Sequence, residues 1–354
     1  MQRQHLDFAV ALHRELADDG GGVVWSPYSV ASALGLAAVG ARASTRDELV
    51  RALGGDLEAL AAALAKAAQI DDADIGVANS LWMRLGLPFH EDYQEAVRRW
   101  PGGTLEVADF ADDPNGARQK INNTVEQDTR GLIRELLAEG TITSQTAAVI
   151  VNALFLKVAW QTPFGADETR QAPFHAPSGT RDVLTMRRTE RIRYAESGGW
   201  RMVTLPTASR DVVVDLLLVD DTAAGLTSDS VRRLWSAAKP TRVSLAVPRF
   251  RVEAGFPLNG PLAAVGVGDA FDHRRADFRG ITDEEMFIET AVHKAVLTVD
   301  EQGFEGAAAS ALIFALTSID LSRPVTFHAD RPFFVLVRHT GTGAVYFLAH
   351  VTEP

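Results

Sequence analysis

No group of side chains in this 354-residue sequence matches a catalytic motif. The sequence lacks a Gly-x-Ser-x-Gly nucleophile elbow, a His-Glu-x-x-His metal motif and a glycine-rich phosphate loop ending in Lys-Ser or Lys-Thr. Its nine histidines are scattered without the spacing of metal ligands. Because there is no cysteine, thiolate nucleophiles, disulfides and Cys-type zinc sites are excluded. We therefore expect no catalytic residue, no metal site, no cofactor and no enzymatic activity.

The most unusual stretch is residues 300–317, which read DEQGFEGAAASALIFALT. An acidic start with two glycines is followed by a run of tiny side chains and then by an apolar tip ending at Thr317. Tiny side chains allow a backbone to pass between other strands without steric cost, but they also leave a free loop poorly fixed. Taken alone, the stretch favours a flexible Gly/Ala linker or a marginal alanine-rich helix. Its role therefore depends on the elements around it.

Composition indicates a globular protein with a large core, since 46% of the residues are hydrophobic and 23% are charged. The net charge of −11 disfavours nucleic acids and anionic membranes as partners, because there is no basic excess to neutralise phosphates. It also opposes self-association, so we expect a monomer. No apolar run approaches the ~18–20 residues that span a bilayer, and the N-terminus lacks the pattern of a signal peptide. The compartment stays open between cytoplasmic and secreted after processing.

The elements that would position residues 300–317 divide into a helical half and a strand-rich half. Apolar residues at helical spacing predict helices in residues 4–18, 29–40, 44–52, 57–70 and 114–137, the last broken near Thr129. Runs rich in β-branched and aromatic residues predict strands at 75–83, 147–160, 191–194, 201–206, 211–219, 242–252, 291–299, 333–339 and 344–350. Residues 147–160 are almost free of polar side chains, which is typical of a strand buried on both faces. The sequence therefore predicts an α+β fold.

Several segments, all in the same order and covering nearly the whole chain, resemble the serpin family of serine protease inhibitors. They are VWSPYS at 24–29, LGLAAVGA at 34–41, TRDE at 45–48, NALFLKVAW at 152–160, PRF at 248–250, LAAVG at 262–266, VHKA at 292–295, FHADRPF at 327–333 and GAVYF at 343–347. Each fragment is short, but together in this order they are highly specific. The prevalence of Arg over Lys and the abundance of Ala are typical of a GC-rich bacterial gene, so we expect a bacterial member.

The resemblance implies a single domain over residues 1–354, with three β-sheets, about nine α-helices and an exposed reactive-centre loop at about 301–323. A serine protease attacks this loop as a substrate and forms an acyl-enzyme. The cleaved loop then inserts into the largest sheet as an extra strand, and the attached protease is distorted. The implied function is that of a suicide-substrate inhibitor whose partner is a target serine protease held in a covalent complex.

The resemblance assigns the hinge of this loop to Glu301, Gly303, Phe304, Glu305, Gly306, Ala307, Ala308 and Ala309. Because side chains alternate along a strand, Phe304, Gly306 and Ala308 share one face, and that face continues through Ser310 and Leu312. This face is nearly free of polar groups and suits the core side of a sheet, whereas Glu305 falls on the other face.

Four polar residues resemble the family's shutter beneath the large sheet: Ser26, Ser29, Asn152 and His293. Their hydroxyl, amide and imidazole groups suit one buried hydrogen-bond network, which is costly to leave half satisfied. Trp160 matches the breach, where insertion begins. Each of these residues taken singly is also explained as an ordinary buried core residue.

The family's spacing from Glu301 places the scissile bond at Thr317-Ser318, with Leu316 as the alternative if the register shifts by one residue. No Arg or Lys lies between Glu301 and Ser322, so a trypsin-like target is disfavoured. A shallow or apolar protease pocket suits Thr317 or Leu316. The resemblance therefore predicts inhibition of elastase-like, chymotrypsin-like or subtilisin-like serine proteases.

Phe304 departs from the family pattern, in which the first residue to insert is usually a small hydroxyl residue. A ring at this position is expected to impede insertion and to make inhibition slower or less complete. The same departure supports an alternative, a non-inhibitory serpin with a carrier, storage or chaperone role. Gly306 and the alanines after it still favour an inhibitory hinge.

Overall fold

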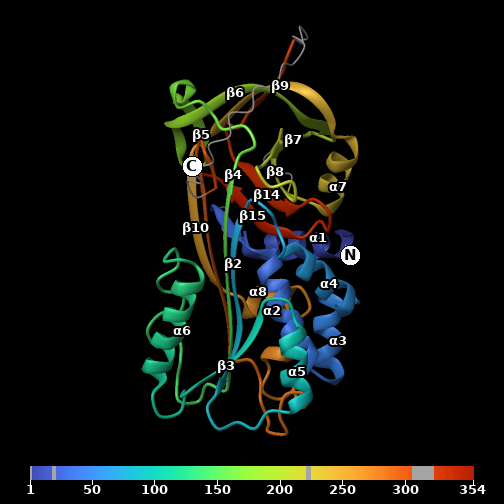
Figure 1. Cartoon of the computed structure of the whole chain (residues 1–354), viewed down its shortest axis with the longest axis vertical. Coiled ribbons are helices and arrows are strands. Elements are labelled where there is room, and N and C mark those ends of the chain that lie inside the picture. Colours follow the sequence, from blue (N-terminus) through green and yellow to red (C-terminus); the bar gives the residue numbers. More distant parts are fainter. Residues whose placement is uncertain (1, 18–20, 221–224, 305–322) are drawn as a thin grey trace.

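The computed structural model describes residues 2–17, 21–220, 225–304 and 323–354, and these form an elongated molecule (Figure 1). Within these ranges the eight α-helices are α1 (Gln2–Leu16), α2 (Pro27–Gly40), α3 (Ala43–Ala52), α4 (Leu57–Ala67), α5 (Glu91–Arg99), α6 (Pro114–Asp128), α7 (Ser228–Ala237) and α8 (Asn259–Ala264). Two 3-10 turns, Ala166–Glu168 and Asp269–Phe271, accompany them. No helix in the described part of the chain is long and apolar enough to cross a membrane.

Strands make up most of the remaining described chain. They are β1 (Val23–Trp25), β2 (Asp74–Arg84), β3 (Gly103–Ala108), β4 (Ala148–Ala159), β5 (Arg170–Ala176), β6 (Gly179–Ser197), β7 (Trp200–Pro206), β8 (Val212–Val219), β9 (Lys239–Pro248), β10 (Phe250–Pro257), β11 (Thr290–Val299), β12 (Gly303–Phe304), β13 (Val325–His328), β14 (Phe333–His339) and β15 (Val345–Val351). The α+β fold class predicted from the sequence is confirmed.

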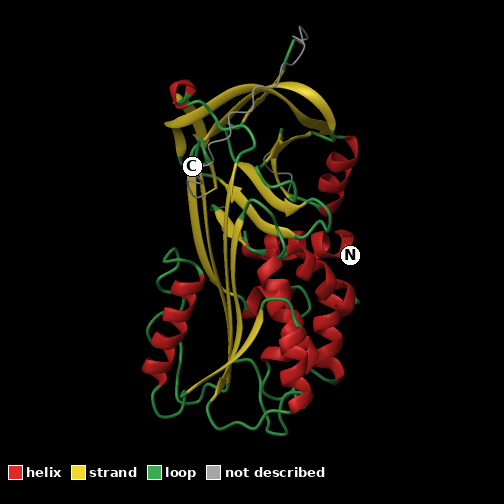
Figure 2. Ribbon diagram, in the orientation of Figure 1, coloured by secondary structure: helices red, strands yellow, loops and turns green. Residues whose placement is uncertain are grey.

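The main sheet runs along the length of the molecule in the order β10-β11-β12-β4-β2-β3. Five of these strands are long, and β12 adds only two residues between β11 and β4. Helix α2 contacts one face of this sheet and α6 contacts it from the other side (Figure 2). Every residue of β4 except Lys157 is therefore buried, which explains why its sequence is almost uniformly apolar.

The second sheet has nine strands, and the 19-residue β6 holds it together. The first part of β6 pairs with β5, its middle pairs with β9, and its last residues pair with β7. Two of the three sheets that the serpin fold implies therefore share one long, continuous strand. β13, the strand that follows residues 305–322, pairs in parallel with β9 at the edge of this sheet.

The predicted pair of helices over residues 114–137 is half right. Helix α6 ends at Asp128, next to the predicted break, but residues 129–137 form no second helix. Arg130 and Gly131 adopt positive φ angles of 53° and 81°, which a helix cannot continue through. Beyond them, the side-chain oxygen of Asn122 accepts hydrogen bonds from the backbone N–H groups of Leu136 and Leu137. These bonds replace those of a second helix, so a polar side chain inside α6 decides the path of the loop.

Candidate functional site

Trp160, at the end of β4, lies directly beside the segment that leads into residues 305–322. Its indole N–H donates to the backbone oxygen of Asp300 at 2.9 Å, and its backbone N–H donates to the oxygen of Gln302, also at 2.9 Å. The indole ring packs against Phe304, with 5.2 Å between ring centroids, and against Phe164 at 6.2 Å. The predicted breach residue therefore contacts the start of the predicted hinge through both its backbone and its ring.

Glu301 anchors the start of the hinge. Its side chain is almost fully buried, and one carboxylate oxygen accepts hydrogen bonds from Thr169 at 2.6 Å and from Arg249 Nε at 2.7 Å. Burial alone raises the pKa of this carboxyl group, but the hydrogen bonds from Arg249 and Thr169 outweigh it and lower the pKa overall. Its backbone oxygen also accepts from the N–H of Phe164 at 2.9 Å. Glu301 is thus held in its ionised form.

Gly303 and Phe304 form β12 and already lie between the two central strands of the main sheet. Phe304 pairs with Val158 of β4 and with Val299 of β11, and its side chain is fully buried. Gly303 has a φ of +147°, and a Cβ atom at this position would lie 2.3 Å from the backbone oxygen of Val158. Only glycine fits here, because the hinge backbone presses directly against β4.

The position of the Phe304 ring removes the reason to expect slow insertion. The expectation that a ring impedes insertion assumes that the ring starts outside the sheet. In the structure the ring is already inside, packed against Trp160. The steric obstacle expected at the start of insertion is therefore absent at this residue, and the predicted slowing of inhibition loses its physical basis.

Next to β12, a short stretch of β11 faces a short stretch of β4. The backbone edges of these two stretches pair with no described residue. β11 pairs directly with β4 through residues 290–294 and 149–153, and pairing resumes through β12 at Val299 and Val158. Between these points, residues 295–298 of β11 face residues 154–157 of β4. Unpaired backbone edges of this kind readily accept an additional strand.

The four shutter residues form one buried network just below this stretch. The Ser26 N–H donates to His293 Nε2 at 3.0 Å, and His293 Nδ1 lies 2.5 Å from the side-chain oxygen of Asn152. Ser26 Oγ caps α2 by accepting the Ser29 N–H at 3.1 Å. The structure therefore brings together all four residues predicted from the sequence, and it links β11 and β4 to the start of α2.

His293 is neutral in this network. Its Nε2 atom accepts a hydrogen bond, so the proton sits on Nδ1 and is donated to Asn152. Burial lowers the pKa of His293 to about 3. The ring of Trp25 contacts the imidazole edge-on, at 6.4 Å between centroids. A protonated imidazole would be costly here, because the Ser26 N–H already points at Nε2.

Asn79 belongs to the same buried network, and the sequence reasoning missed it. Its side-chain oxygen accepts from Ser29 Oγ and from Asn152 Nδ2, both at 2.7 Å. Asn79 of β2 lies directly opposite Asn152 of β4 in the antiparallel register. The available signal was a polar residue in the middle of an otherwise apolar strand. Its role required the cross-strand pairing, which the sequence does not contain.

Several predicted residues lie outside the described part of the chain. These are the hinge residues Glu305, Gly306, Ala307, Ala308 and Ala309 and the bait residues Leu316, Thr317 and Ser318. Their assignments remain predictions.

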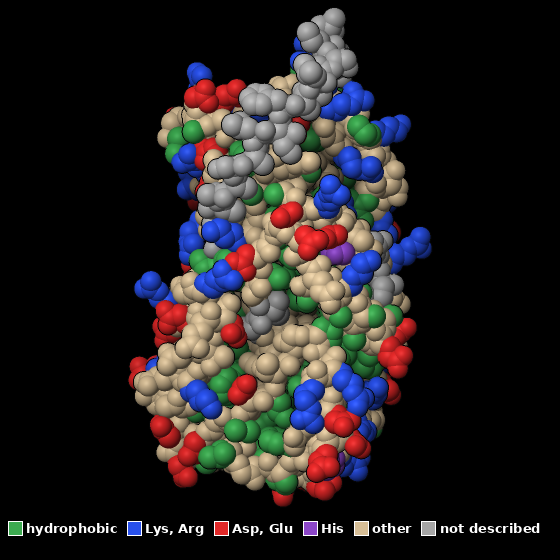
Figure 3. All heavy atoms as spheres, viewed as in Figure 1, with side chains coloured by type: hydrophobic (Ala, Val, Ile, Leu, Met, Phe, Trp, Pro, Cys, Tyr) green, Lys and Arg blue, Asp and Glu red, His purple; other side chains and the backbone are tan. Residues whose placement is uncertain are grey.

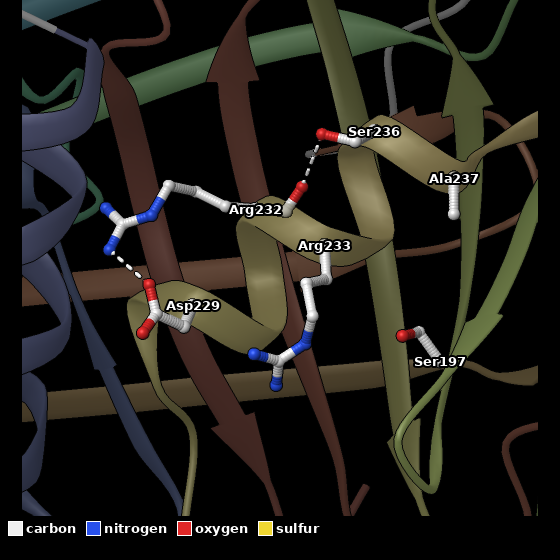
Figure 4. Close-up of a pocket in the computed structure, with 6 residues that line it drawn as sticks. All are labelled: Ser197, Asp229, Arg232, Arg233, Ser236 and Ala237. Carbon is white, nitrogen blue, oxygen red and sulfur yellow. Dashed lines mark hydrogen bonds and ion pairs between the residues drawn. The ribbon is translucent and has the colours of Figure 1, made fainter.

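One further groove in the described structure contains a serine but no arrangement of catalytic side chains. This groove of about 460 Å³ lies between α7 and the end of β6 and is lined by Ser197, Asp229, Arg232, Arg233, Ser236 and Ala237 (Figure 4). Arg232 is neutralised there by Asp229 and by Asp7, and no histidine is among the residues that line the groove with Ser197. Among the described residues, no group of three His, Asp or Glu side chains is arranged to hold a metal ion.

Known proteins resemble this chain over almost its full length. The family model described as "Serpin (serine protease inhibitor)" matches residues 3–354. An uncharacterized serpin-like protein of Thermococcus kodakarensis is 30% identical over 98% of this chain and 84% of its own. The leukocyte elastase inhibitor of Sus scrofa is 31% identical over 98% of this chain and 97% of its own.

Solved structures agree with the sequence comparison. Uncleaved ovalbumin superimposes with a TM-score of 0.88 and 26% identity, and the match covers 100% of both chains. Thyroxine-binding globulin in complex with thyroxine shares the fold, with a TM-score of 0.87 and 23% identity over 100% of this chain and 99% of its own. Proteins of this family are protease inhibitors or have other non-enzymatic roles. The chain is a member of the serpin family and is not an enzyme.

Proposed function

We propose that this chain inhibits serine proteases of chymotrypsin-like, elastase-like or subtilisin-like specificity by acting as a suicide substrate. The protease attacks the Thr317-Ser318 bond, the acyl-enzyme forms, and the freed segment inserts between β4 and β11. Insertion carries the attached protease away from its starting position and distorts its active site. The inhibitory relatives support this proposal, since elastase inhibitors and an antithrombin are among the similar proteins.

The single observation that carries the proposal is the position of β12. Gly303 and Phe304 already pair between β4 and β11, and the edges below them face each other without a described partner. A strand that continued from Phe304 toward the shutter would pair with residues 154–157 on one side and 295–298 on the other. The hinge therefore points along the path that insertion would take.

Energy favours insertion once the loop is cut. Each new ladder hydrogen bond contributes about 1 kcal/mol net, so about ten bonds contribute on the order of 10 kcal/mol before ordering entropy is subtracted. Cleavage frees one end of the segment and removes the topological obstacle. The shutter must part to admit the strand, so the direct pairing of β11 with β4 at residues 290–294 and 149–153 is the part of the sheet that opens.

The specificity follows from the bait residues. Thr317 or Leu316 suits a shallow or apolar primary pocket, and the segment from Glu301 to Ser322 contains no Arg or Lys. A protease with an acidic primary pocket would find no matching side chain there.

The test is covalent complex formation with an elastase, a chymotrypsin and a subtilisin at several enzyme ratios. We expect an SDS-resistant band with the mass of both chains less the C-terminal peptide that cleavage releases, and mass spectrometry of that peptide should locate the cut at Thr317-Ser318. Cleavage without a complex, by every protease and at every ratio, would show that the chain is a substrate only.

A matched pair of loop variants tests insertion itself. Continuing the alternation from Phe304, Ala308 shares its core-facing side whereas Ala309 falls on the opposite side. We expect Ala308→Arg to be cleaved without trapping the protease, because a buried unpaired charge blocks insertion. Ala309→Arg should retain inhibition.

The alternative is a non-inhibitory serpin with a carrier, storage or chaperone role. It is supported by the likeness to ovalbumin. Thermal melting before and after cleavage of the loop separates the two. A large upward shift in Tm supports insertion and inhibition, whereas an unchanged Tm supports the non-inhibitory role.

A further inference from the structure

On one face of the β6 and β9 ribbon, the charged residues at the described ladder positions are all arginines. Arg187, Arg191 and Arg193 alternate along β6, so their side chains share one side of the strand. In the antiparallel register Arg242 of β9 lies directly opposite Arg191. The positions between them on this face are Thr189 and Ser244, opposite each other, and the ends are Ala246 and Pro240. We call these residues the arginine face.

This face is unusual in a protein with a net charge of −11. Its ladder positions contain four arginines and no carboxylate. The one acid of this part of β6, Glu190, points to the other side, where it pairs with Arg188 at 2.8 Å. The overall acidity therefore does not exclude a local basic surface. Figure 3 shows Lys and Arg side chains over the upper part of the molecule, with Asp and Glu side chains among them.

Two of the four arginines have no carboxylate partner in the described part of the chain. Arg193 is exposed and Arg187 is half-buried. Arg191 and Arg242 each have an interaction partner. From Arg187 to Arg193 the row spans about 20 Å, at the usual rise of a strand. Arg187 and Arg193, at the two ends of this row, are suited to the carboxylates of another molecule, because a guanidinium group binds a carboxylate in a bidentate manner.

The arginine face lies beside the point where the chain returns from residues 305–322. β13 begins at Val325 and pairs in parallel with β9, so Thr326 and His328 extend the same face next to Ser244 and Ala246. Arg187, Ala246 and His328 line one small cleft together with Asp330 at its rim. Burial and, to a smaller extent, the charge of Arg187 lower the pKa of His328.

We propose that the arginine face is a docking surface for an acidic patch on the target protease, adjacent to the protease's active site. The proposal rests on the inhibitory function proposed above. A protease that holds the bait loop must lie over the end of the molecule to which β13 returns, so the face is within its reach. Opposite charges on the two surfaces accelerate association and favour acidic proteases over basic ones of the same specificity.

The test compares two subtilisin-type proteases of opposite net charge. We expect R187Q/R193Q to react about tenfold more slowly than the wild-type chain with the acidic protease at low salt. The difference should disappear near 0.5 M salt, because exposed charges are then screened. The number of inhibitor molecules consumed per protease should stay the same, since the substitutions do not touch the hinge or the shutter.

The matched control is R51Q/R98Q, which removes two exposed arginines from α3 and α5 in the lower, helical half (Figure 1). It lowers the net charge equally, and its rate should stay within about twofold of wild type. Equal rates for both double variants with the acidic protease would overturn the proposal. A rate that falls equally for the acidic and the basic protease would also overturn it.

A second measurement tests the docking surface independently of protease inhibition. Binding of the acidic protease with its catalytic Ser replaced by Ala reports docking without chemistry. If the wild-type chain traps no protease, yet R187Q/R193Q raises this Kd about tenfold and R51Q/R98Q does not, the docking surface stands and the inhibitory function is wrong. If trapping occurs and both variants bind like wild type, the inhibitory function stands and the docking surface is wrong.

A linear polyanion is the competing occupant. Dextran sulfate serves as the probe at 150 mM salt. Loss of its binding in R187Q/R193Q, with protease docking unchanged, would assign the face to polyanions and overturn the protease contact.

Discussion

Single residues at the site act mainly through their backbone and hydrogen-bond geometry. Asn79 contributes one oxygen that holds both Ser29 and Asn152, and it joins two strands to α2. Gly303 contributes the absence of a side chain, because the oxygen of Val158 occupies the place of a Cβ atom. Neither residue takes part in a covalent reaction. Both decide how firmly the sheet is held closed and how closely the hinge approaches it.

Replacing Asn79 by alanine leaves the Ser29 hydroxyl and the Asn152 amide without their shared acceptor. We expect Asn79→Ala to lower the free energy of unfolding by about 2–4 kcal/mol, since two buried donors lose a partner. Urea unfolding measures the change. The control is Asn123→Ala, an exposed asparagine on α6 that should cost less than about 0.5 kcal/mol. Equal losses for the two variants would argue against a shared network.

Replacing Gly303 by alanine forces the hinge away from β4. We expect Gly303→Ala to cost about 1–3 kcal/mol and to expose the hinge to proteolysis, because φ is +147° and the new Cβ meets backbone. Limited proteolysis with the peptides identified by mass spectrometry measures the exposure. Gly260→Ala is the control, since nothing lies within 4 Å of a Cβ there. A hinge equally resistant in both variants would contradict the close approach.

At the scale of elements, the decisive feature is a two-residue strand between two long ones. β12 is too short to be stable alone, and three flanking contacts hold it in place. These are the Glu301 anchor, the Trp160 hydrogen bonds and the Phe304 ring. The Phe164 ring continues the stack toward β6, where the guanidinium of Arg188 lies 4.2 Å from its centroid. The hinge is therefore packed into the junction of the two sheets.

Replacing Phe304 by serine restores the small hydroxyl residue that is usual in the family. We expect Phe304→Ser to lower the free energy of unfolding by about 3 kcal/mol or more, because a fully buried ring is lost from against Trp160. Tryptophan fluorescence should change with it. The control Phe287→Ser removes a half-buried ring far from the hinge and should cost less. If Phe304→Ser is as stable as wild type, the ring does not hold the hinge.

At the scale of the whole molecule, buried histidines make the fold sensitive to acid. Burial lowers the pKa of His5 and His350 to about 4 and the pKa of His13 and His293 to about 3. All four are neutral in the fold but take up protons near pH 6.5 when unfolded. Their contribution to stability is therefore complete above pH 6.5 and is lost as the pH falls toward 3–4.

One histidine provides the quantitative test of this acid sensitivity. His13 accepts the indole N–H of Trp25 at 3.3 Å, and glutamine can accept the same hydrogen bond without titrating. We expect His13→Gln to reduce the slope of unfolding free energy against pH by about 1.4 kcal/mol per pH unit between pH 4 and 6. Urea unfolding across this range measures the slope. Equal slopes for His13→Gln and for the wild-type chain would refute the linkage.

The family and the fold class could be predicted from the sequence alone. Long apolar runs such as residues 147–160 predict a strand buried on both faces, and short signatures from residue 24 to residue 347 identify the family because their order is specific. The same resemblance predicted Ser26, Ser29, Asn152 and His293 as the shutter, and the structure brings these four residues together in one network. Local patterns suffice for these features, because burial and turn chemistry are encoded residue by residue.

Only the tertiary structure decided how these residues meet. The role of Asn79 required the register of β2 against β4, and the end of α6 at Asp128 required side-chain bonds from Asn122 to the following loop. The expectation that the Phe304 ring impedes insertion no longer holds, because the ring is already buried inside the sheet. The arginine face became visible only when β6 and β9 were paired, since net charge sums over the chain whereas a binding surface depends on which charges share a side. Pairing across distant segments is set by packing, and a linear sequence does not state it.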